Sequence, residues 1–150
     1  GATAYRPAVP LSEGPHVYQV TALNPVGVAR PASPATVLVD TIAPSARVRL
    51  SGRRRVGAAV RLQVRYSDVR PPEPPAASSG VAYVNVNWGD GFKAKIGHGK
   101  FHVYRRPGLY KLTVAVADRA GNKATVVHFL RIVPAARVRR AAHSAPRRRR

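Results

Sequence analysis

Hydrophobic and polar residues alternate with a period of two over much of the chain after Pro44. The clearest example is 58–66, where valine, leucine and tyrosine take every second position and Arg61, Gln63 and Arg65 lie between them. Successive side chains of a strand point to opposite faces, so this pattern predicts a half-buried strand. Similar patterns predict further strands at 46–50, 83–88 and 110–117, and short strands are also expected at 92–96 and 101–104.

Turn signals separate these stretches. Asp90-Gly91 is a strong hairpin signal, and Pro107-Gly108 and Gly121-Asn122 are turn dipeptides. The long segment 68–80 contains four prolines and is either a functional loop or a tolerated insertion. Residues 124–133 are apolar at both sets of positions, which predicts a strand covered on both faces. Seven short strands joined by turns favour a two-sheet β-sandwich.

The composition supports an all-β fold. The 150 residues include 22 valines against 8 leucines and 3 isoleucines, and the 14 prolines exclude a helical bundle. The absence of cysteine excludes disulfides, thiolate metal sites and a cysteine nucleophile. No apolar run approaches the roughly 20 residues of a membrane span. No export signal occurs at the N-terminus, so we expect export to be directed from outside these residues.

Residues 84–118 carry a family resemblance. The matching residues, in order, are Trp88-Gly89-Asp90-Gly91, His102-Val103-Tyr104, Pro107-Gly108-Leu109-Tyr110, Leu112-Thr113-Val114-Ala115-Val116-Ala117-Asp118 and Arg119-Ala120-Gly121-Asn122. In order and spacing they resemble the PKD (polycystic kidney disease repeat) family of immunoglobulin-like sandwiches. The resemblance covers about 44–133 and implies a non-catalytic module of an extracellular protein.

We expect these motif residues to determine the fold. Gly89 and Gly91 permit positive φ in a tight turn, and Asp90 can cap backbone N–H groups there. Gly108 should let Tyr110 enter its strand buried, like the tyrosine at the corner of immunoglobulin strands. We expect five residues to be buried together because each lies on the apolar face of its strand: Trp88, Tyr110, Val114, Val64 and Val86.

The first part of the chain carries a weaker resemblance. Residues 14–44 look like the last two strands of a bacterial Ig-like or fibronectin type III module, and the linker Asp40-Thr41-Ile42-Ala43-Pro44 is typical of tandem arrays. The predicted division is therefore 1–43, the C-terminal part of such a module; 44–136, the PKD-like sandwich; and 137–150, a disordered Arg-rich tail.

Catalytic and metal-binding patterns are missing from the sequence. The five histidines do not show the spacing of a zinc site, and no nucleophile elbow or phosphate-binding loop occurs. We therefore expect neither an enzyme nor a bound cofactor. Ca²⁺ sites do occur at junctions of Ig-like arrays, which makes Asp40, Asp68 and Asp118 weak candidates. The module's net charge of +13 and the lack of Asp-x-Asp spacings argue against a site, so none is predicted.

Basic charge is the second signal. The net charge is +20, and 137–150 alone contributes +7. The candidate contacts for a polyanion are Arg53, Arg54, Arg55, Arg105, Arg106, Arg137, Arg139, Arg140, Arg147, Arg148, Arg149 and Arg150. Such density holds polyanions through counterion release. The competing interpretation is that a GC-rich genome favours arginine codons, and that arginine on solvent-exposed faces only keeps the module soluble.

Three functions remain open. The first is a spacer or adhesion module of a secreted or surface-displayed bacterial protein, with neighbouring Ig-like modules, carbohydrate or surface proteins as partners. The second is a module that binds acidic glycopolymer, phospholipid or nucleic acid. The third is an accessory domain of an extracellular hydrolase.

Overall fold

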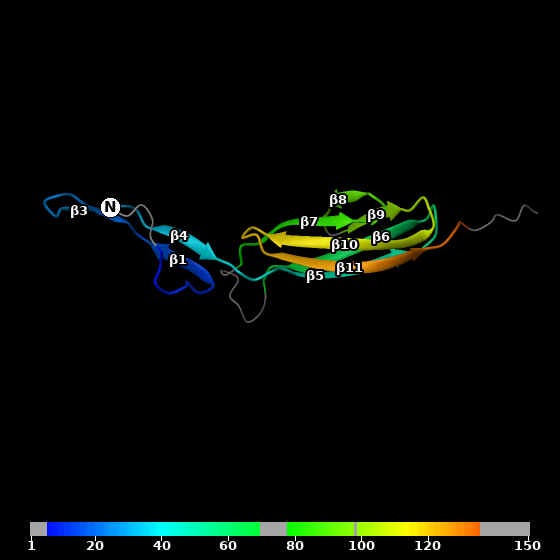
Figure 1. Cartoon of the computed structure of the whole chain (residues 1–150), viewed down its shortest axis with the longest axis horizontal. Coiled ribbons are helices and arrows are strands. Elements are labelled where there is room, and N and C mark those ends of the chain that lie inside the picture. The colour runs from blue at the N-terminus through cyan, green and yellow to red at the C-terminus, as the bar shows by residue number, and fades with distance from the viewer. Residues whose placement is uncertain (1–5, 70–77, 98, 136–150) are drawn as a thin grey trace, which may run out of the picture.

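A computed structural model describes residues 6–69, 78–97 and 99–135, and these residues contain strands and loops but no helix. None of the described part could cross a membrane as a helix. The strands form two small pairs near the N-terminus and two larger sheets that pack face to face (Figure 1).

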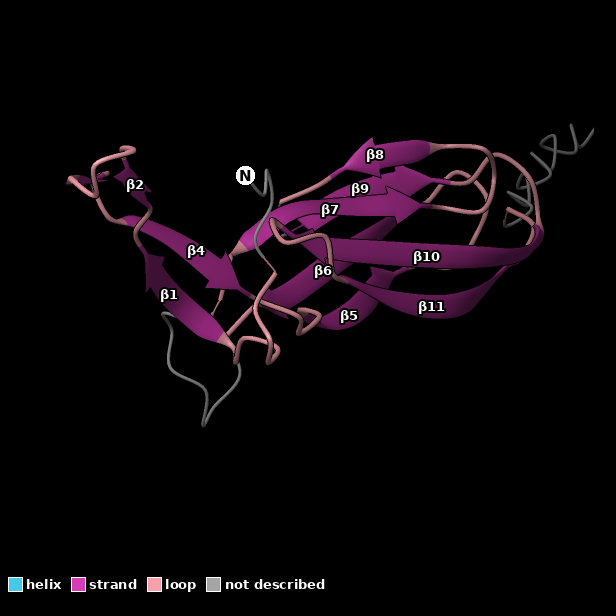
Figure 2. Ribbon diagram, turned by 60° about the vertical axis from the view of Figure 1, so that its left-hand side comes forward, coloured by secondary structure: helices cyan, strands magenta, loops and turns pink. Residues whose placement is uncertain are grey.

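The N-terminal strands form two antiparallel pairs. β1 (Gly14–Tyr18) pairs with β4 (Ala35–Val39), and β2 (Thr21–Leu23) pairs with β3 (Ala29–Pro31). Most of their side chains are exposed, including Val17, Leu23, Val37 and Leu38. Both pairs lie on one side of the linker after β4 (Figures 1 and 2). The division of the chain at 43 stays a prediction.

The two larger sheets form the predicted sandwich. One contains β5 (Ser45–Gly52), β6 (Ala59–Ser67) and β9 (Gly99–Val103), in the order β5-β6-β9. The other contains β7 (Val81–Asn87), β8 (Lys93–Lys95), β10 (Gly108–Asp118) and β11 (Lys123–Ile132), in the order β11-β10-β7-β8. All neighbours are antiparallel, and the chain changes sheet after β6, after β8 and after β9. Each strand that alternation predicted is present.

The predicted hairpin turn joins β7 to β8. Gly89 and Gly91 have φ values of 84° and 94°, and the Asp90 carboxylate accepts the Phe92 N–H at 3.2 Å. A Cβ on Gly89 would lie 2.7 Å from the Lys111 carbonyl oxygen. Glycine is thus required here by the approach of β10 as well as by the backbone conformation.

The core lies between the sheets and is built from the apolar face of each strand. Trp88 is its largest residue and has no exposed surface. Val64, Val86 and Val114 are buried with it, as predicted. Tyr110 is only partly buried and packs against this core. Its hydroxyl donates to the Arg106 carbonyl at 2.8 Å, the backward hydrogen bond of a tyrosine corner.

Tyr104 takes the fully buried position that we expected for Tyr110. Its hydroxyl donates to the Trp88 carbonyl at 2.9 Å. Burial, and then the nearby Asp90 and Tyr110, raise the pKa of Tyr104 far above its usual range. The phenol therefore stays protonated and keeps donating this bond. The pattern of residues 101–104 is too short to predict that Tyr104 would be the residue buried in the core.

The expectation that 124–133 is covered on both faces is wrong. β11 is an edge strand, and its outward residues Val127 and Phe129 are 42% and 66% exposed. Leu130 and Ile132, on the inward face, are buried. An apolar run on both faces therefore did not distinguish a covered strand from an edge strand with an apolar outer face.

Replacing Trp88 should test the core directly. Trp88→Ala is expected to lower the free energy of unfolding by about 3–5 kcal/mol, because it leaves a large cavity between the sheets. Urea denaturation of the whole chain measures this. The control Phe129→Ala removes an exposed aromatic residue and should cost less than about 1 kcal/mol. Equal losses for the two variants would contradict the assignment of Trp88 to the core.

Candidate functional site

Three carboxylates converge where the N-terminal pairs meet the sandwich. The candidate ligand atoms of Asp40, Asp68 and Asp118 all lie within 4.8 Å of one another. Asp40 follows β4, Asp68 follows β6, and Asp118 ends β10, so three separate segments supply the group. This end of the sandwich faces β1 and β4 (Figure 2). We call Asp40, Asp68 and Asp118 the junction cluster.

Asp118 is held by the turn that it begins. Its Oδ1 accepts the N–H groups of Gly121 and Asn122 at 2.7 and 2.8 Å. The side chain is buried, and Gly121 has a φ of 99°, which completes the tight turn into β11. The local role of Asp118, Gly121 and Asn122 is thus to form this turn. A carboxylate that caps this turn is fixed in place at the junction.

Asn122 links the turn to the incoming linker. Its amide Nδ2 donates to the Asp40 carbonyl and to Asp118 Oδ2, both at 2.9 Å. Sequence reasoning treated Asn122 only as a turn residue. The second role was hidden because Asp40 and Asn122 are 82 positions apart.

Asp40 is held from the opposite side by Ser79. The Ser79 N–H donates to Asp40 Oδ2 at 2.7 Å, and the Ile42 N–H donates to Oδ1 at 3.3 Å. Burial raises the pKa of the Asp40 carboxyl, but hydrogen bonds from the Ser79 side chain and backbone and from Ile42 outweigh it. The pKa therefore lies below its usual range, and the carboxyl stays ionised in the folded protein.

Asp68 has one oxygen that is satisfied and one that is not. Its Oδ2 accepts the Gly80 N–H at 2.6 Å and the Ser78 hydroxyl at 2.7 Å. Its Oδ1 is buried and has no hydrogen-bond partner among the described residues. A buried carboxylate oxygen without a partner destabilises the fold, because it loses hydrogen bonds to water and gains none from the protein.

The junction cluster brings negative charges together with no basic side chain paired to them among the described residues. Two unit charges less than 5 Å apart repel by roughly 3 kcal/mol at an effective dielectric constant of about 20. In the described part of the chain, no lysine, arginine or histidine lies within ion-pair distance of these carboxylates. Backbone N–H groups offset part of the repulsion, but the Asp68 Oδ1 remains unmatched.

These donors suit a hard divalent cation. The group offers carboxylate oxygens and no nitrogen or sulfur ligand, which is the chemistry of Ca²⁺ or Mg²⁺ sites rather than zinc sites. The unpartnered Asp68 oxygen is what a bound cation would satisfy. The three residues therefore fit Ca²⁺, the ion for which the sequence makes them weak candidates, although no site is predicted from the sequence.

A second cluster lies at the opposite end of the sandwich. His102 donates to or accepts from Asp90 at 2.7 Å and stacks with Trp88 and Phe92, at centroid distances of 4.6 and 5.3 Å. An adjoining depression of about 620 Å³ is lined by Asp90, Phe92, His102, Val103, Arg105, Arg106 and Tyr110. No serine, threonine or cysteine lines it, so the His102–Asp90 pair has no nucleophile to activate there. We assign the pair to the packing of Trp88.

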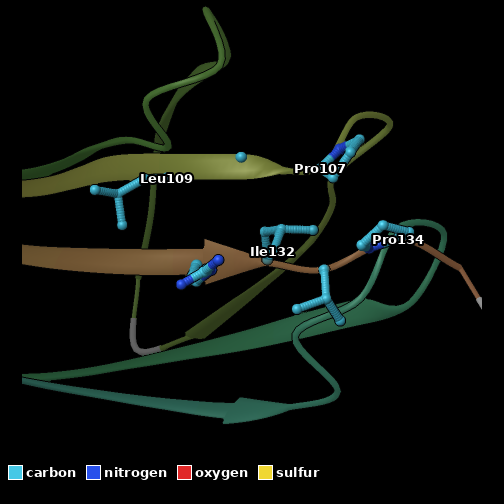
Figure 3. Close-up of a pocket in the computed structure, with 7 residues that line it drawn as sticks. Pro107, Leu109, Ile132 and Pro134 are labelled. Carbon is cyan, nitrogen blue, oxygen red and sulfur yellow. The ribbon is translucent and has the colours of Figure 1, made fainter.

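Another depression, of about 520 Å³, lies beside the end of β11. Leu109, Ile132 and Val133 line it together with Pro107 and Pro134, as the close-up in Figure 3 shows. Arg131 is its one charged residue. It therefore offers apolar contact surface but no set of groups for chemistry.

The polyanion candidates are spread over the molecule. Arg53, Arg54 and Arg55 lie in the turn between β5 and β6, and Arg105 and Arg106 lie in the turn before β10. Arg137, Arg139, Arg140 and Arg147 to Arg150 lie outside the described residues, as does His98. The structure thus brings the three weak metal candidates together and leaves the described polyanion candidates in separate turns.

Comparison with models of protein families and with curated protein sequences gives no match. Among solved structures, the chain is similar to a carbohydrate-binding module from the β-sandwich superfamily, with a TM-score of 0.53 and 20% identity. The similarity covers 65% of this chain but only 37% of that one.

Two PKD1 domains are also similar. The domain of Vibrio anguillarum Epp has a TM-score of 0.48 and 17% identity, over 63% of this chain and 98% of that chain. The domain of the Vibrio cholerae metalloprotease PrtV has a TM-score of 0.48 and 22% identity, over 61% of this chain and 99% of that chain. The sheet topology and the similarity to the carbohydrate-binding module confirm the predicted two-sheet β-sandwich. PKD domains are among the solved structures that the chain resembles.

The lowered pKa of Asp40 predicts a dependence of stability on pH. A carboxyl with a depressed folded pKa stabilises the protein above its unfolded pKa of about 3.9, and this stabilisation is lost as pH falls through the folded value. Asp40→Asn should therefore lose less stability than the wild type between pH 6 and pH 2.5. Urea unfolding in metal-free buffer at several pH values measures the difference, and parallel pH profiles would contradict it.

Proposed function

We propose that this chain is a non-catalytic β-sandwich module of a secreted or surface-displayed bacterial multidomain protein. It acts as a spacer, and a divalent cation at the junction cluster fixes it to the segment before it. The observation that carries the proposal is the convergence of Asp40, Asp68 and Asp118, with one buried carboxylate oxygen left unpartnered.

The contacts at the junction support a spacer. The linker after β4 is bound to the sandwich by Ser79 and Asn122, and Glu13 near β1 accepts the Thr41 N–H at 3.1 Å. Ser79 also accepts the Ala120 N–H at 3.1 Å, which joins the two loops of the sandwich that face the linker. Hydrogen bonds alone therefore already connect the two parts.

A cation would strengthen this connection through charge. Asp40 belongs to the linker, whereas Asp68 and Asp118 belong to the sandwich. Without a cation their like charges push the linker away from the sandwich; with Ca²⁺ the same oxygens become ligands of one ion. The ion would then cross-link three segments and make the orientation of the preceding segment rigid. Ca²⁺ suits a surface protein because sites of this kind saturate at extracellular concentrations.

The non-catalytic assignment has its own support. Among the described residues, the His102–Asp90 pair is stacked against core aromatics and has no nucleophile beside it. One similar solved structure, with a TM-score of 0.53, is described as a carbohydrate-binding module. Sequencing the gene upstream of this region would test the setting, because a spacer predicts further Ig-like modules and an export signal.

Adding Ca²⁺ to the chelator-treated chain should raise its melting temperature. A ligand at a hundredfold excess over its Kd stabilises the folded state by about 2.7 kcal/mol, which circular dichroism detects as a shift of several degrees. Isothermal titration calorimetry should give one site per chain.

Two variants make this test specific. Asp68→Asn should abolish the Ca²⁺ response, yet be no less stable than the wild type in chelator, because it removes a repelling charge and keeps an acceptor for the Gly80 N–H. Asp90→Asn should keep the full response, since Asp90 lies beyond the far end of β7. An unchanged melting temperature for the wild type would rule out the cation.

A further inference from the structure

The outward face of the β5-β6-β9 sheet is basic along its whole length. Four arginines project from it, Arg47 and Arg49 from β5 and Arg61 and Arg65 from β6, and all four are exposed. They alternate with core residues, so the burial of Val48 and Leu62 forces them outward. Gln63 and Phe101 complete this surface, which we call the arginine face: Arg47, Arg49, Arg61, Gln63, Arg65 and Phe101.

Strand register brings these side chains into rows. Arg47 pairs with Arg65, Arg49 pairs with Gln63, and Arg61 pairs with Phe101 across to β9. Alternate residues of a strand lie about 7 Å apart, and neighbouring strands lie about 4.8 Å apart. The backbone positions that carry these side chains are therefore regularly spaced across the face. A depression of about 300 Å³ lies among Arg47, Arg49, Gln63 and Arg65.

The described residues provide no carboxylate partner for these arginines. In the part of the chain that the structure describes, the arginine face forms no ion pair with a carboxylate. Like charges that lie opposite each other on neighbouring strands destabilise a sheet. The pairing of Arg47 with Arg65 therefore lowers the stability of the fold, and these exposed side chains do not contribute to the core in return. An anionic ligand would offset that cost.

Arginine predominates on this face, whereas lysine predominates on the outward face of the other sheet. The outward face of the four-stranded sheet carries Lys93, Lys95 and Lys111 with Arg131, interspersed with asparagine, threonine and apolar residues. Genome composition acts on both faces alike, so it does not explain a face of arginine beside one dominated by lysine. Arginine differs because its planar fork binds carboxylate, sulfate or phosphate groups in a bidentate way.

Phe101 adds a flat apolar surface at the edge of the face. Its side chain is 64% exposed, and Arg61 Cζ lies 5.7 Å from its ring centroid. An aromatic ring has a negative face that attracts polarised C–H groups, such as those of a pyranose ring. Surfaces that bind single-stranded nucleic acid use successive aromatic residues for successive bases, whereas the arginine face has one.

We propose that the arginine face binds an acidic polysaccharide, that is, a linear glycan with carboxylate or sulfate groups. The arginines bind the anionic groups, Gln63 bonds to hydroxyl groups between them, and Phe101 packs against a sugar ring. Arg53, Arg54 and Arg55 follow β5 along the chain and are exposed, so they add positive charge near one end of this sheet. This inference is independent of the cation at the junction cluster.

The test compares two variants of the full chain that lose the same charge. The first carries Arg47→Gln, Arg49→Gln, Arg61→Gln and Arg65→Gln. The control carries Lys93→Gln, Lys95→Gln, Lys111→Gln and Arg131→Gln on the other sheet, where all four side chains are exposed. Binding to labelled heparin and to polygalacturonate is measured in EGTA at 0.15 M salt, which keeps any effect of the junction cluster out of the result. Melting temperatures confirm that both variants fold.

The first variant should bind both glycans at least about tenfold more weakly than the wild type, and its slope of log K against log salt should fall by about 3. The control should stay within about threefold of the wild type. Phe101→Ala should weaken binding several-fold without changing the slope, because it removes no charge. Neutral dextran should not bind.

Two results would overturn the proposal. Equal losses for the two four-residue variants would show that binding follows net charge alone. Tighter binding of single-stranded DNA than of both glycans at equal charge would assign the face to nucleic acid instead. Binding of heparin but not of polygalacturonate would identify sulfate as the bound group. Binding of polygalacturonate but not of heparin would identify carboxylate. Both results support the proposal that the arginine face binds an acidic polysaccharide.

Discussion

The whole molecule depends on the enclosure of Trp88 between two sheets. Its ring has no exposed surface, Tyr104 donates to its carbonyl, and His102 stacks on it. Burying this residue requires each strand to turn its apolar face inward. Because side chains of a strand alternate, that requirement also decides what points outward. The arginine face is thus a consequence of how the core is packed.

The junction cluster depends on the same packing in another way. The register of β10 with β7 places Asp118 near the start of β7, and the pairing of β5 with β6 brings Asp68 to the same end as the incoming linker. Three of the six acidic residues of the chain therefore meet at one point. Their charges lie close together, so a divalent cation bound there would offset their mutual repulsion.

The two surfaces carry opposite charge and lie on different parts of the sandwich. The junction cluster lies where the linker after β4 reaches the sandwich, whereas the arginine face lies on the outward side of β5 and β6. This arrangement agrees with the proposed row of modules, in which the ends would contact neighbouring modules and the sides would remain open to other partners.

The sequence alone determined the strands, the hairpin at Asp90-Gly91 and the core around Trp88, because alternation and turn chemistry are local properties. It did not show that Tyr104 rather than Tyr110 would be enclosed, or that β11 would be an edge strand, because both depend on which strands lie next to each other. It named Asp40, Asp68 and Asp118 but could not bring them together across 78 positions. Likewise, Arg61 and Arg65 were visible as one face of a strand, whereas their pairing with Arg47 and Phe101 was decided by the register of three strands. Contacts between segments distant in the chain are set by packing of the sheets, and only the tertiary structure contains that information.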